Sequence, residues 1–213
     1  MTELVFIERP ASGEAEGLLV LHHGRGTSEQ DLLPLADELD PQRRLHVASA
    51  RAPFRLEGMP GYHWYLVPRV GHPDPETFAA STAALGELHD ELWESTGIGP
   101  ERTVLGGFSM GTVMSYALGL HPDRPSVGGI LAFSGFIPTV EGWEPELAER
   151  TQTSVLIAHG RADPVIGVEF ARRARERLES AGLEVDYRES DAQHYIEAAD
   201  VARAADWLRR ALS

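Results

Sequence analysis

The stretch that decides the fold runs from residue 102 to residue 120 and reads "RTVLGGFSMGTVMSYALGL". A short apolar run leads into glycines that flank Ser109, and apolar residues at helical spacing follow. G-x-S-x-G between a buried strand and a helix forms a sharp, strained turn that exposes the serine hydroxyl. We therefore predict a strand over 103–108, a helix after it, and a nucleophile at Ser109; a helix-capping serine is the alternative.

Further apolar segments predict strands on both sides of this turn. They are "LLVLHH" (18–23), "LHVAS" (45–49), "GGILAFSG" (128–135), "SVLIAHG" (154–160) and "EVDYRE" (184–189). Several show no alternation of apolar and polar residues, which is typical of strands buried on both faces.

Helical patterns lie between the strands. They cover Leu32–Leu39, Glu76–Ser95, Val113–Leu120, Val165–Ala181 and Val201–Leu208. We expect Thr27 and Gln30 to form a capping box that starts the first helix, Pro164 to start the fourth, and Gly182 to stop it. The alternation predicts one α/β domain over residues 1–213, with a mainly parallel sheet and helices on both faces.

The composition excludes several function classes. The chain has no cysteine and no lysine, which rules out disulfides, thiolate chemistry and a Schiff base. Its formal net charge of −14 disfavours nucleic acid and membrane surfaces as partners. With no apolar leader or spanning segment, we expect a cytoplasmic protein; Phe54 and Leu56 make a homodimer plausible.

A serine nucleophile needs a base and a group that orients the base. Asp163 follows the strand "SVLIAHG", and His194 follows the last predicted strand. The order Ser109, Asp163, His194 is the one that G-x-S-x-G hydrolases use. Asp191 shares the loop of His194 and ranks far below Asp163; a helix-capping aspartate and a surface histidine are the alternatives.

The segment "LHHGRGT" ends the first buried strand and predicts an oxyanion hole. By position, its donor is the backbone N–H of Arg25, joined by the N–H of Met110 after the nucleophile. We expect no metal at His22 and His23, because adjacent strand residues point to opposite faces; one of them should pack under the loop.

Apolar and aromatic residues near these segments are candidates for substrate contact, with ordinary core packing as the alternative. They are Trp64 and Tyr65 in a long loop at 51–76, together with Phe108, Met110, Phe136 and Ile137.

These motifs together resemble the phospholipase/carboxylesterase family of small serine esterases, which includes acyl-protein thioesterases. The resemblance rests on "LHHGRGT", "GYHWYLV", "GFSMG", "SGFIP", "HGRADPVI" and "QHYI", and it covers nearly the whole chain. It implies an α/β-hydrolase fold without a large lid domain, no cofactor, and the same triad and oxyanion donors.

The chain departs from the family at three positions. Met110 and Thr27 stand where the family often has glutamine and aspartate, and Gln193 stands where it often has glycine. If the last position needs a positive φ, Gln193 would be strained. The resemblance implies hydrolysis of small-molecule carboxylic esters through an acyl-enzyme. A thioesterase, a lysophospholipase and a non-catalytic binding protein of this fold are the alternatives.

Overall fold

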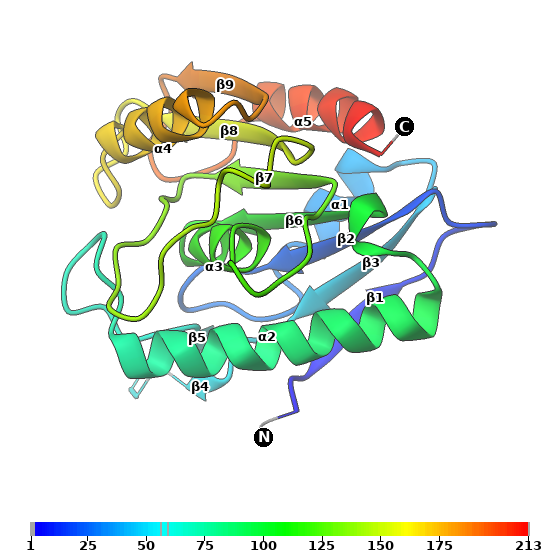
Figure 1. Ribbon diagram of the computed structural model, residues 1–213, viewed down its shortest axis with the longest axis horizontal. Helices are drawn as coiled ribbons and strands as arrows, with labels where there is room; N and C mark the ends of the chain where they lie inside the picture. Colours follow the sequence, from blue (N-terminus) through cyan, green and yellow to red (C-terminus); the bar gives the residue numbers. More distant parts are fainter. Residues whose placement is uncertain (1–2, 56, 59, 213) are drawn as a thin grey trace.

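The computed structural model describes residues 3–55, 57–58 and 60–212, and it contains a seven-stranded sheet in the order β1-β3-β2-β6-β7-β8-β9 (Figure 1). β1 pairs with β3 antiparallel, and all other pairs are parallel. The strands are β1 (Phe6–Arg9), β2 (Gly17–His22), β3 (Leu45–Ala50), β6 (Thr103–Phe108), β7 (Gly129–Phe133), β8 (Ser154–Gly160) and β9 (Val185–Ser190). A separate hairpin joins β4 (Phe54–Arg55) to β5 (Tyr62–His63).

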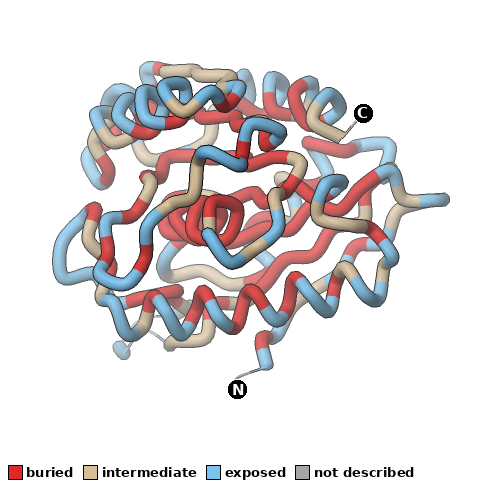
Figure 2. The backbone as a smooth tube through the Cα atoms, in the orientation of Figure 1, coloured by how far each residue is buried: buried red, intermediate tan, exposed pale blue. Residues whose placement is uncertain are grey.

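Helices cover both faces of the sheet. On one face lie α2 (Pro75–Thr96), α3 (Met110–Gly119) and α4 (Glu169–Ser180), and on the other lie α1 (Leu33–Leu39) and α5 (Ala198–Ala211); a short 3₁₀ turn, η1 (Pro100–Arg102), precedes β6. Successive side chains of β6 enter different cores, since Leu105 packs with the α2–α3–α4 side and Val104 with the α1–α5 side. The central strands and α3 are buried nearly throughout (Figure 2).

These observations confirm the predicted fold class. The six predicted strands all form: β6 and β8 have the predicted bounds, and the ends of the other four are shifted by at most two residues. β1 is an addition: its four residues are too few to show a periodic pattern, and β3 supplies its hydrogen-bond partners. No large lid domain interrupts the part of the chain that the structure describes.

Two predicted helix-start signals are wrong. α1 begins at Leu33, within one residue of the predicted pattern, but the Thr27 hydroxyl donates to the Gly24 carbonyl (3.0 Å) rather than capping a helix. α4 begins at Glu169, so Pro164 lies in the turn before it. The predicted stop is correct: Gly182 follows α4 with φ +89°, a conformation that glycine adopts without strain.

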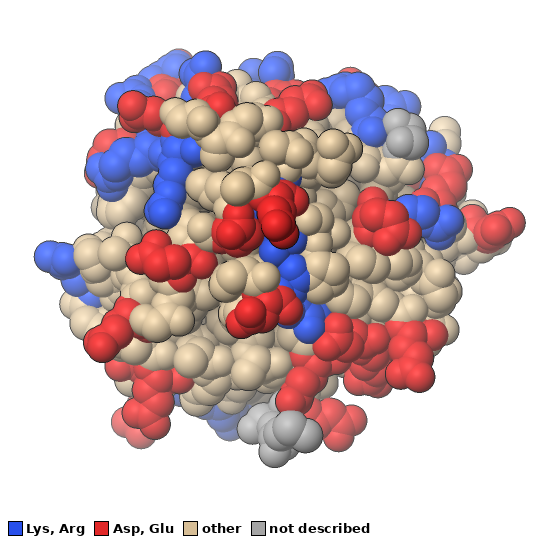
Figure 3. Space-filling view, viewed as in Figure 1, with Lys and Arg blue, Asp and Glu red and all other residues tan. Residues whose placement is uncertain are grey.

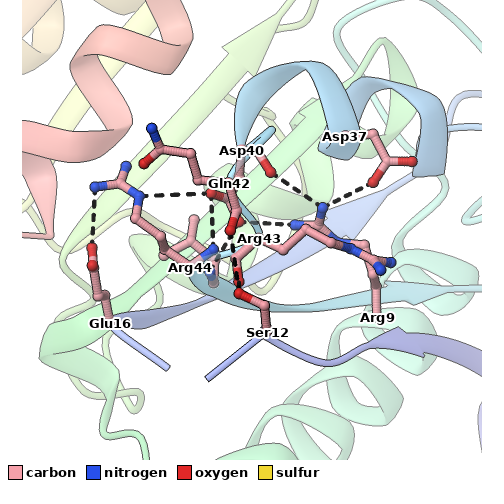
Figure 4. Close-up of polar contacts among 9 residues, drawn as sticks. Arg9, Ser12, Glu16, Asp37, Asp40, Gln42, Arg43 and Arg44 are labelled. Atoms are coloured by element: carbon pink, nitrogen blue, oxygen red, sulfur yellow. Dashed lines mark hydrogen bonds and ion pairs between the residues drawn. The ribbon is translucent and has the colours of Figure 1, made fainter. Parts of the chain in front are cut away.

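A buried ion pair fastens β1 to the connection between α1 and β3 (Figure 4). Arg9 donates to Asp40 Oδ2 (3.0 Å) and to Asp37 (2.9 Å). Asp40 also accepts the backbone N–H groups of Arg44 (3.1 Å) and Leu45 (2.9 Å). These contacts link β1 to the α1–β3 connection.

Two residues suggested a homodimer in the sequence. Phe54 is half-buried in β4, and Leu56 lies outside the described residues.

Candidate active site

Ser109 occupies the predicted strained turn between β6 and α3. Its φ of 56° and ψ of −117° are unusual for a residue with a side chain, and its N–H donates to the Phe133 carbonyl (2.9 Å). The flanking glycines are required: a Cβ on Gly107 would lie 2.3 Å from the Gly111 backbone, and one on Gly111 would lie 1.8 Å from the His22 carbonyl. Close contact between the turn and its neighbours therefore fixes the position of the hydroxyl.

Three predicted residues from distant parts of the chain meet at this turn. His194 Nε2 lies 2.9 Å from Ser109 Oγ, and His194 Nδ1 lies 2.7 Å from Asp163 Oδ2. Because a carboxylate only accepts, Nδ1 carries the ring proton and Nε2 is free to accept the serine proton. The Asp163 side chain is fully buried, whereas that of His194 is 19% exposed.

Backbone groups hold Asp163 in place. Its Oδ1 accepts the N–H groups of Val165 (2.8 Å) and Ile166 (2.9 Å), so its other oxygen faces His194. The buried His159 donates from Nε2 to the Ile166 carbonyl (2.7 Å) and lies 3.4 Å from Asp163 Oδ2. Sequence reasoning did not single out His159, although it lies in the quoted "HGRAD" segment.

The loop that carries His194 approaches β8 closely. A Cβ on Gly160 would lie 2.2 Å from the Ala192 carbonyl, so only glycine fits there. Asp191 points away and pairs with Arg161 (2.6 Å), as its low ranking predicted. Within the described residues, positive φ occurs at non-glycine positions 43, 109 and 134, so Gln193 is not strained.

The predicted oxyanion donors lie on two fixed segments. Met110 is the first residue of α3, where backbone N–H groups lack helical acceptors. Among residues 3–55, 57–58 and 60–212, neither its N–H nor that of Arg25 donates to a protein acceptor. The loop around Arg25 is held by Gly26, whose N–H donates to the Tyr62 carbonyl (2.9 Å).

His23 fixes the start of the same loop. Its Nε2 accepts the N–H of Ala52 (3.0 Å), so Nδ1 is protonated and donates to the Gly24 carbonyl (2.6 Å). The Thr27 hydroxyl donates to that carbonyl too, so threonine still supports the loop in place of the family's aspartate. Burial lowers the pKa of His23 and favours this neutral form.

His22 and His89 form a buried histidine pair that supports the turn at Ser109 through Ser115. The Ser115 hydroxyl donates to the Gly111 carbonyl (3.1 Å) and accepts from His22 Nδ1 (2.9 Å). His22 Nε2 lies 3.4 Å from His89 Nε2 of α2. Burial lowers the pKa of His22 well below its usual value and that of His89 to about 3, so both rings are neutral. Both predicted histidines therefore form protein hydrogen bonds; Ser115 and His89 gave no signal in the sequence.

Two hollows lie at the carboxyl edge of the sheet, beside the triad. The α1 groove, of about 470 Å³, is lined by Leu35, Phe108, His194, Tyr195 and Val201 among others. The α4 pocket, of about 380 Å³, is lined by His72, Phe136, Ile137, Phe170, Arg173 and Arg177 among others. A third groove, of about 400 Å³, lies over α2 and reaches Leu118 and His121. Leu118 lies near the far end of α3 from Ser109, roughly 13 Å along the helix axis, and His121 follows that helix.

The candidates for substrate contact divide between these hollows and the core. Phe108 lines the α1 groove, and Phe136 and Ile137 line the α4 pocket. Trp64 and Tyr65 are 0% and 2% exposed, which corrects their prediction as substrate contacts. They pack instead, because Trp64 Nε1 donates to the His23 carbonyl (2.9 Å) and its backbone N–H donates to the sulfur of Met110 (3.2 Å).

No helix in the described part of the chain is long and apolar enough to cross a membrane. A cytoplasmic location stays a prediction.

Comparisons with known proteins agree with the fold. Residues 3–212 match the family model described as Phospholipase/Carboxylesterase. The carboxylesterase of Bacillus cereus superposes with a TM-score of 0.85 at 25% identity, covering 98% of this chain and 94% of that one. Esterase PE8 superposes with a TM-score of 0.84 at 30% identity, covering 98% and 99%.

A curated relative carries a thioesterase name. The acyl-protein thioesterase 1 of Debaryomyces hansenii is 30% identical over 131 residues, which span 59% of this chain and 55% of that protein. The match thus covers about half the length of that relative. With the family model spanning almost every residue, the chain belongs to the phospholipase/carboxylesterase family of α/β-hydrolases.

Proposed function

We propose that the protein is a serine carboxylesterase that cleaves carboxylic esters through an acyl-enzyme. The observation that carries this proposal is the continuous hydrogen-bond chain from Ser109 Oγ through His194 (2.9 Å) to Asp163 (2.7 Å). A serine hydroxyl becomes a nucleophile when a base takes its proton, and His194 Nε2 is within reach to do so.

In the first half of the reaction, Ser109 Oγ attacks the ester carbonyl carbon while His194 takes the hydroxyl proton. The backbone N–H groups of Arg25 and Met110 stabilise the negative oxygen that forms. His194 then gives its proton to the leaving alcohol, and the acyl group stays on Ser109. The carboxylate of Asp163 stabilises the imidazolium throughout.

In the second half, water takes the place of the alcohol. His194 removes a proton from the water, the hydroxide attacks the acyl carbon, and the carboxylic acid leaves as Ser109 recovers its proton. Every step uses side chains or backbone groups of this chain, so the proposed reaction needs no cofactor.

A thioesterase is the second candidate. The relative named acyl-protein thioesterase 1 and the apolar residues Leu35 and Val201 of the α1 groove favour it. The same triad would act on a thiolate leaving group. A lysophospholipase stays a third possibility of the same chemistry.

The test measures hydrolysis of 4-nitrophenyl esters from acetate to decanoate, beside matched acyl thioesters, for the parent and for Ser109→Ala. We expect turnover by the parent, an optimum in chain length, and a loss of at least about 10³-fold in the variant. A higher kcat/KM for thioesters would favour the second candidate. Binding of esters without turnover would contradict the proposal and favour a non-catalytic binding protein.

A further inference from the structure

The arginines of α4 differ in their ion pairs. Three of the four have carboxylate partners: Arg172 with Glu189 (2.8 Å), Arg175 with Glu179 (2.8 Å) and Arg177 with Glu144 (3.7 Å). Arg173 has none within 4.0 Å among the described residues, and its guanidinium lies over the Phe170 ring (4.5 Å to the centroid). Arg173 is therefore the arginine of α4 whose charge is not balanced by a neighbouring carboxylate among the described residues.

Arg173 lines the α4 pocket together with Arg177 and His72. The apolar part of the lining includes Phe136 and Phe170, whose ring centroids are 5.2 Å apart. The loop that carries His72 is tied in place, since the N–H of Thr139 donates to the Gly71 carbonyl (3.2 Å). Three donor-bearing side chains therefore line a space of about 380 Å³.

This pocket adjoins the proposed catalytic turn. A Cβ on Gly135 would lie 3.0 Å from the Ser109 carbonyl, and the next residue, Phe136, forms the pocket wall. On its other side, the turn after Asp163 leads directly into α4. The α4 pocket therefore lies one residue along the chain from a direct contact with the Ser109 backbone.

The two hollows beside the triad differ in charge. The α1 groove carries Asp31 and Glu38 and no arginine, whereas the α4 pocket carries Arg173 and Arg177 and no carboxylate. Two carboxylates lie near the pocket: Glu144 beside Arg177, and Glu169, which folds back over Gly167. Basic side chains gather over α4 on the upper left of Figure 3, at the end of the sheet toward which β6, β7 and β8 point.

We propose that the α4 pocket binds an anionic group, a carboxylate or a phosphate, carried by the ester substrate several bonds from the ester that is cleaved. This inference rests on the proposed esterase function and names its substrate class. Guanidinium groups bind both anions with paired N–H donors, and the apolar wall fits the chain that joins the anion to the ester.

The test uses matched pairs of esters and one matched variant. For the acyl side, mono-4-nitrophenyl suberate is compared with 4-nitrophenyl octanoate, which has the same number of carbons. For the alcohol side, 4-carboxyphenyl butyrate is compared with its neutral methyl ester. Arg173→Gln removes the charge in the pocket, and Arg175→Gln is the control, because Arg175 lies on the same helix but does not line the pocket.

We expect Arg173→Gln to lower the ratio of kcat/KM for the anionic ester to that for the neutral ester about three- to tenfold on one of the two sides. The control should keep that ratio, and added salt should lower it in the parent. Equal ratios in Arg173→Gln and the control, on both sides, would overturn the inference.

A binding measurement separates this inference from the proposed function. Calorimetry with Ser109→Ala protein measures the Kd of monoethyl suberate and of hexyl phosphate, with and without Arg173→Gln. We expect Kd to rise about three- to tenfold for whichever anion the pocket prefers. If the parent cleaves no ester, this Kd still tests the anion-binding inference. A rise in Kd supports anion binding in the α4 pocket even though the esterase proposal has failed, and no rise for either ligand overturns the inference.

Discussion

Two buried aspartates, at opposite ends of the sheet, each accept two backbone N–H groups and serve different purposes. Asp163 accepts the backbone N–H groups of Val165 and Ile166, and Asp40 accepts those of Arg44 and Leu45. Each directs an oxygen to a cationic or ionisable side chain, His194 at one end and Arg9 at the other.

The difference lies in the partner. Arg9 is always charged, so its pair with Asp40 acts only as a fixed link between β1 and the α1–β3 connection. His194 can gain and lose a proton, is partly exposed to solvent, and reaches a second group, Ser109. A buried carboxylate held by backbone N–H groups thus gives a structural ion pair with arginine and a candidate proton shuttle with histidine.

The largest expected effect is at the catalytic end of the comparison. Asp163→Asn should still accept the two backbone N–H groups, but it no longer stabilises the imidazolium of His194 or its correct tautomer. We expect kcat/KM for ester hydrolysis to fall about 10⁴-fold, as in the equivalent change in a serine protease triad, with little loss of stability. The control is Asp191→Asn, an exposed residue on the loop that carries His194, which should keep the rate.

At the opposite end of the sheet, Asp40→Asn should lower the stability of the protein and leave its catalysis unchanged. It leaves the 6% exposed Arg9 without its buried carboxylate, and we expect the free energy of unfolding to fall about 3 kcal/mol. Urea denaturation measures this, and kcat/KM per folded molecule should stay at the parent value. Asp37→Asn, whose side chain is 64% exposed, should cost less than about 1 kcal/mol. A loss of catalysis without a loss of stability in Asp40→Asn would break the comparison.

His89 extends the comparison to a buried ionisable side chain that forms no ion pair. His89 has a folded-state pKa of about 3 against 6.5 for the exposed side chain, so the unfolded state binds the extra proton between those values. The stability from the neutral ring is complete above pH 6.5 and is lost as the pH falls. We expect His89→Gln to remove about 2 kcal/mol of the decrease between pH 7 and pH 5, measured by urea denaturation at each pH. An identical pH dependence in the variant would contradict this account.

The smallest expected effect concerns the oxyanion loop. Thr27→Val keeps the shape of the side chain but removes its hydrogen bond to the Gly24 carbonyl. We expect kcat to fall about fivefold, which corresponds to the net free energy of one neutral hydrogen bond, and KM to stay nearly unchanged. Thr27→Ser retains the hydroxyl and should keep the parent kcat; equal losses in both variants would mean that the hydroxyl is not involved.

Local pattern was enough to predict most of the sheet and the three residues that meet at the turn. Ser109, Asp163 and His194 each follow a buried strand, and the ends of parallel strands gather at one edge, so their positions in the chain predict that they meet there. The α4 stop at Gly182 was predictable for a similar reason, since it depends on one residue's backbone freedom.

The features that sequence reasoning missed depend on contacts between distant segments. The Thr27 contact is an exception, because its hydroxyl binds the carbonyl of Gly24, three residues earlier, instead of capping a helix. Arg9 and Asp40 are 31 residues apart, and His22 and His89 are 67 apart. No sequence pattern predicts contacts at these separations. Trp64 and Tyr65 lie in a loop rich in proline and glycine that predicts exposure, yet hydrogen bonds to His23 and Ser81 draw it into the core.

The most direct test of the central claim, that His194 and Asp163 activate Ser109, is the rate of covalent labelling by a fluorophosphonate. Intact mass and peptide mapping would follow the parent, Ser109→Ala, Asp163→Asn and Asp40→Asn. We predict a single adduct on Ser109 in the parent, the same rate in Asp40→Asn, a far slower rate in Asp163→Asn, and none in Ser109→Ala. A folded parent that stays unlabelled, or an adduct on another serine, would contradict the account.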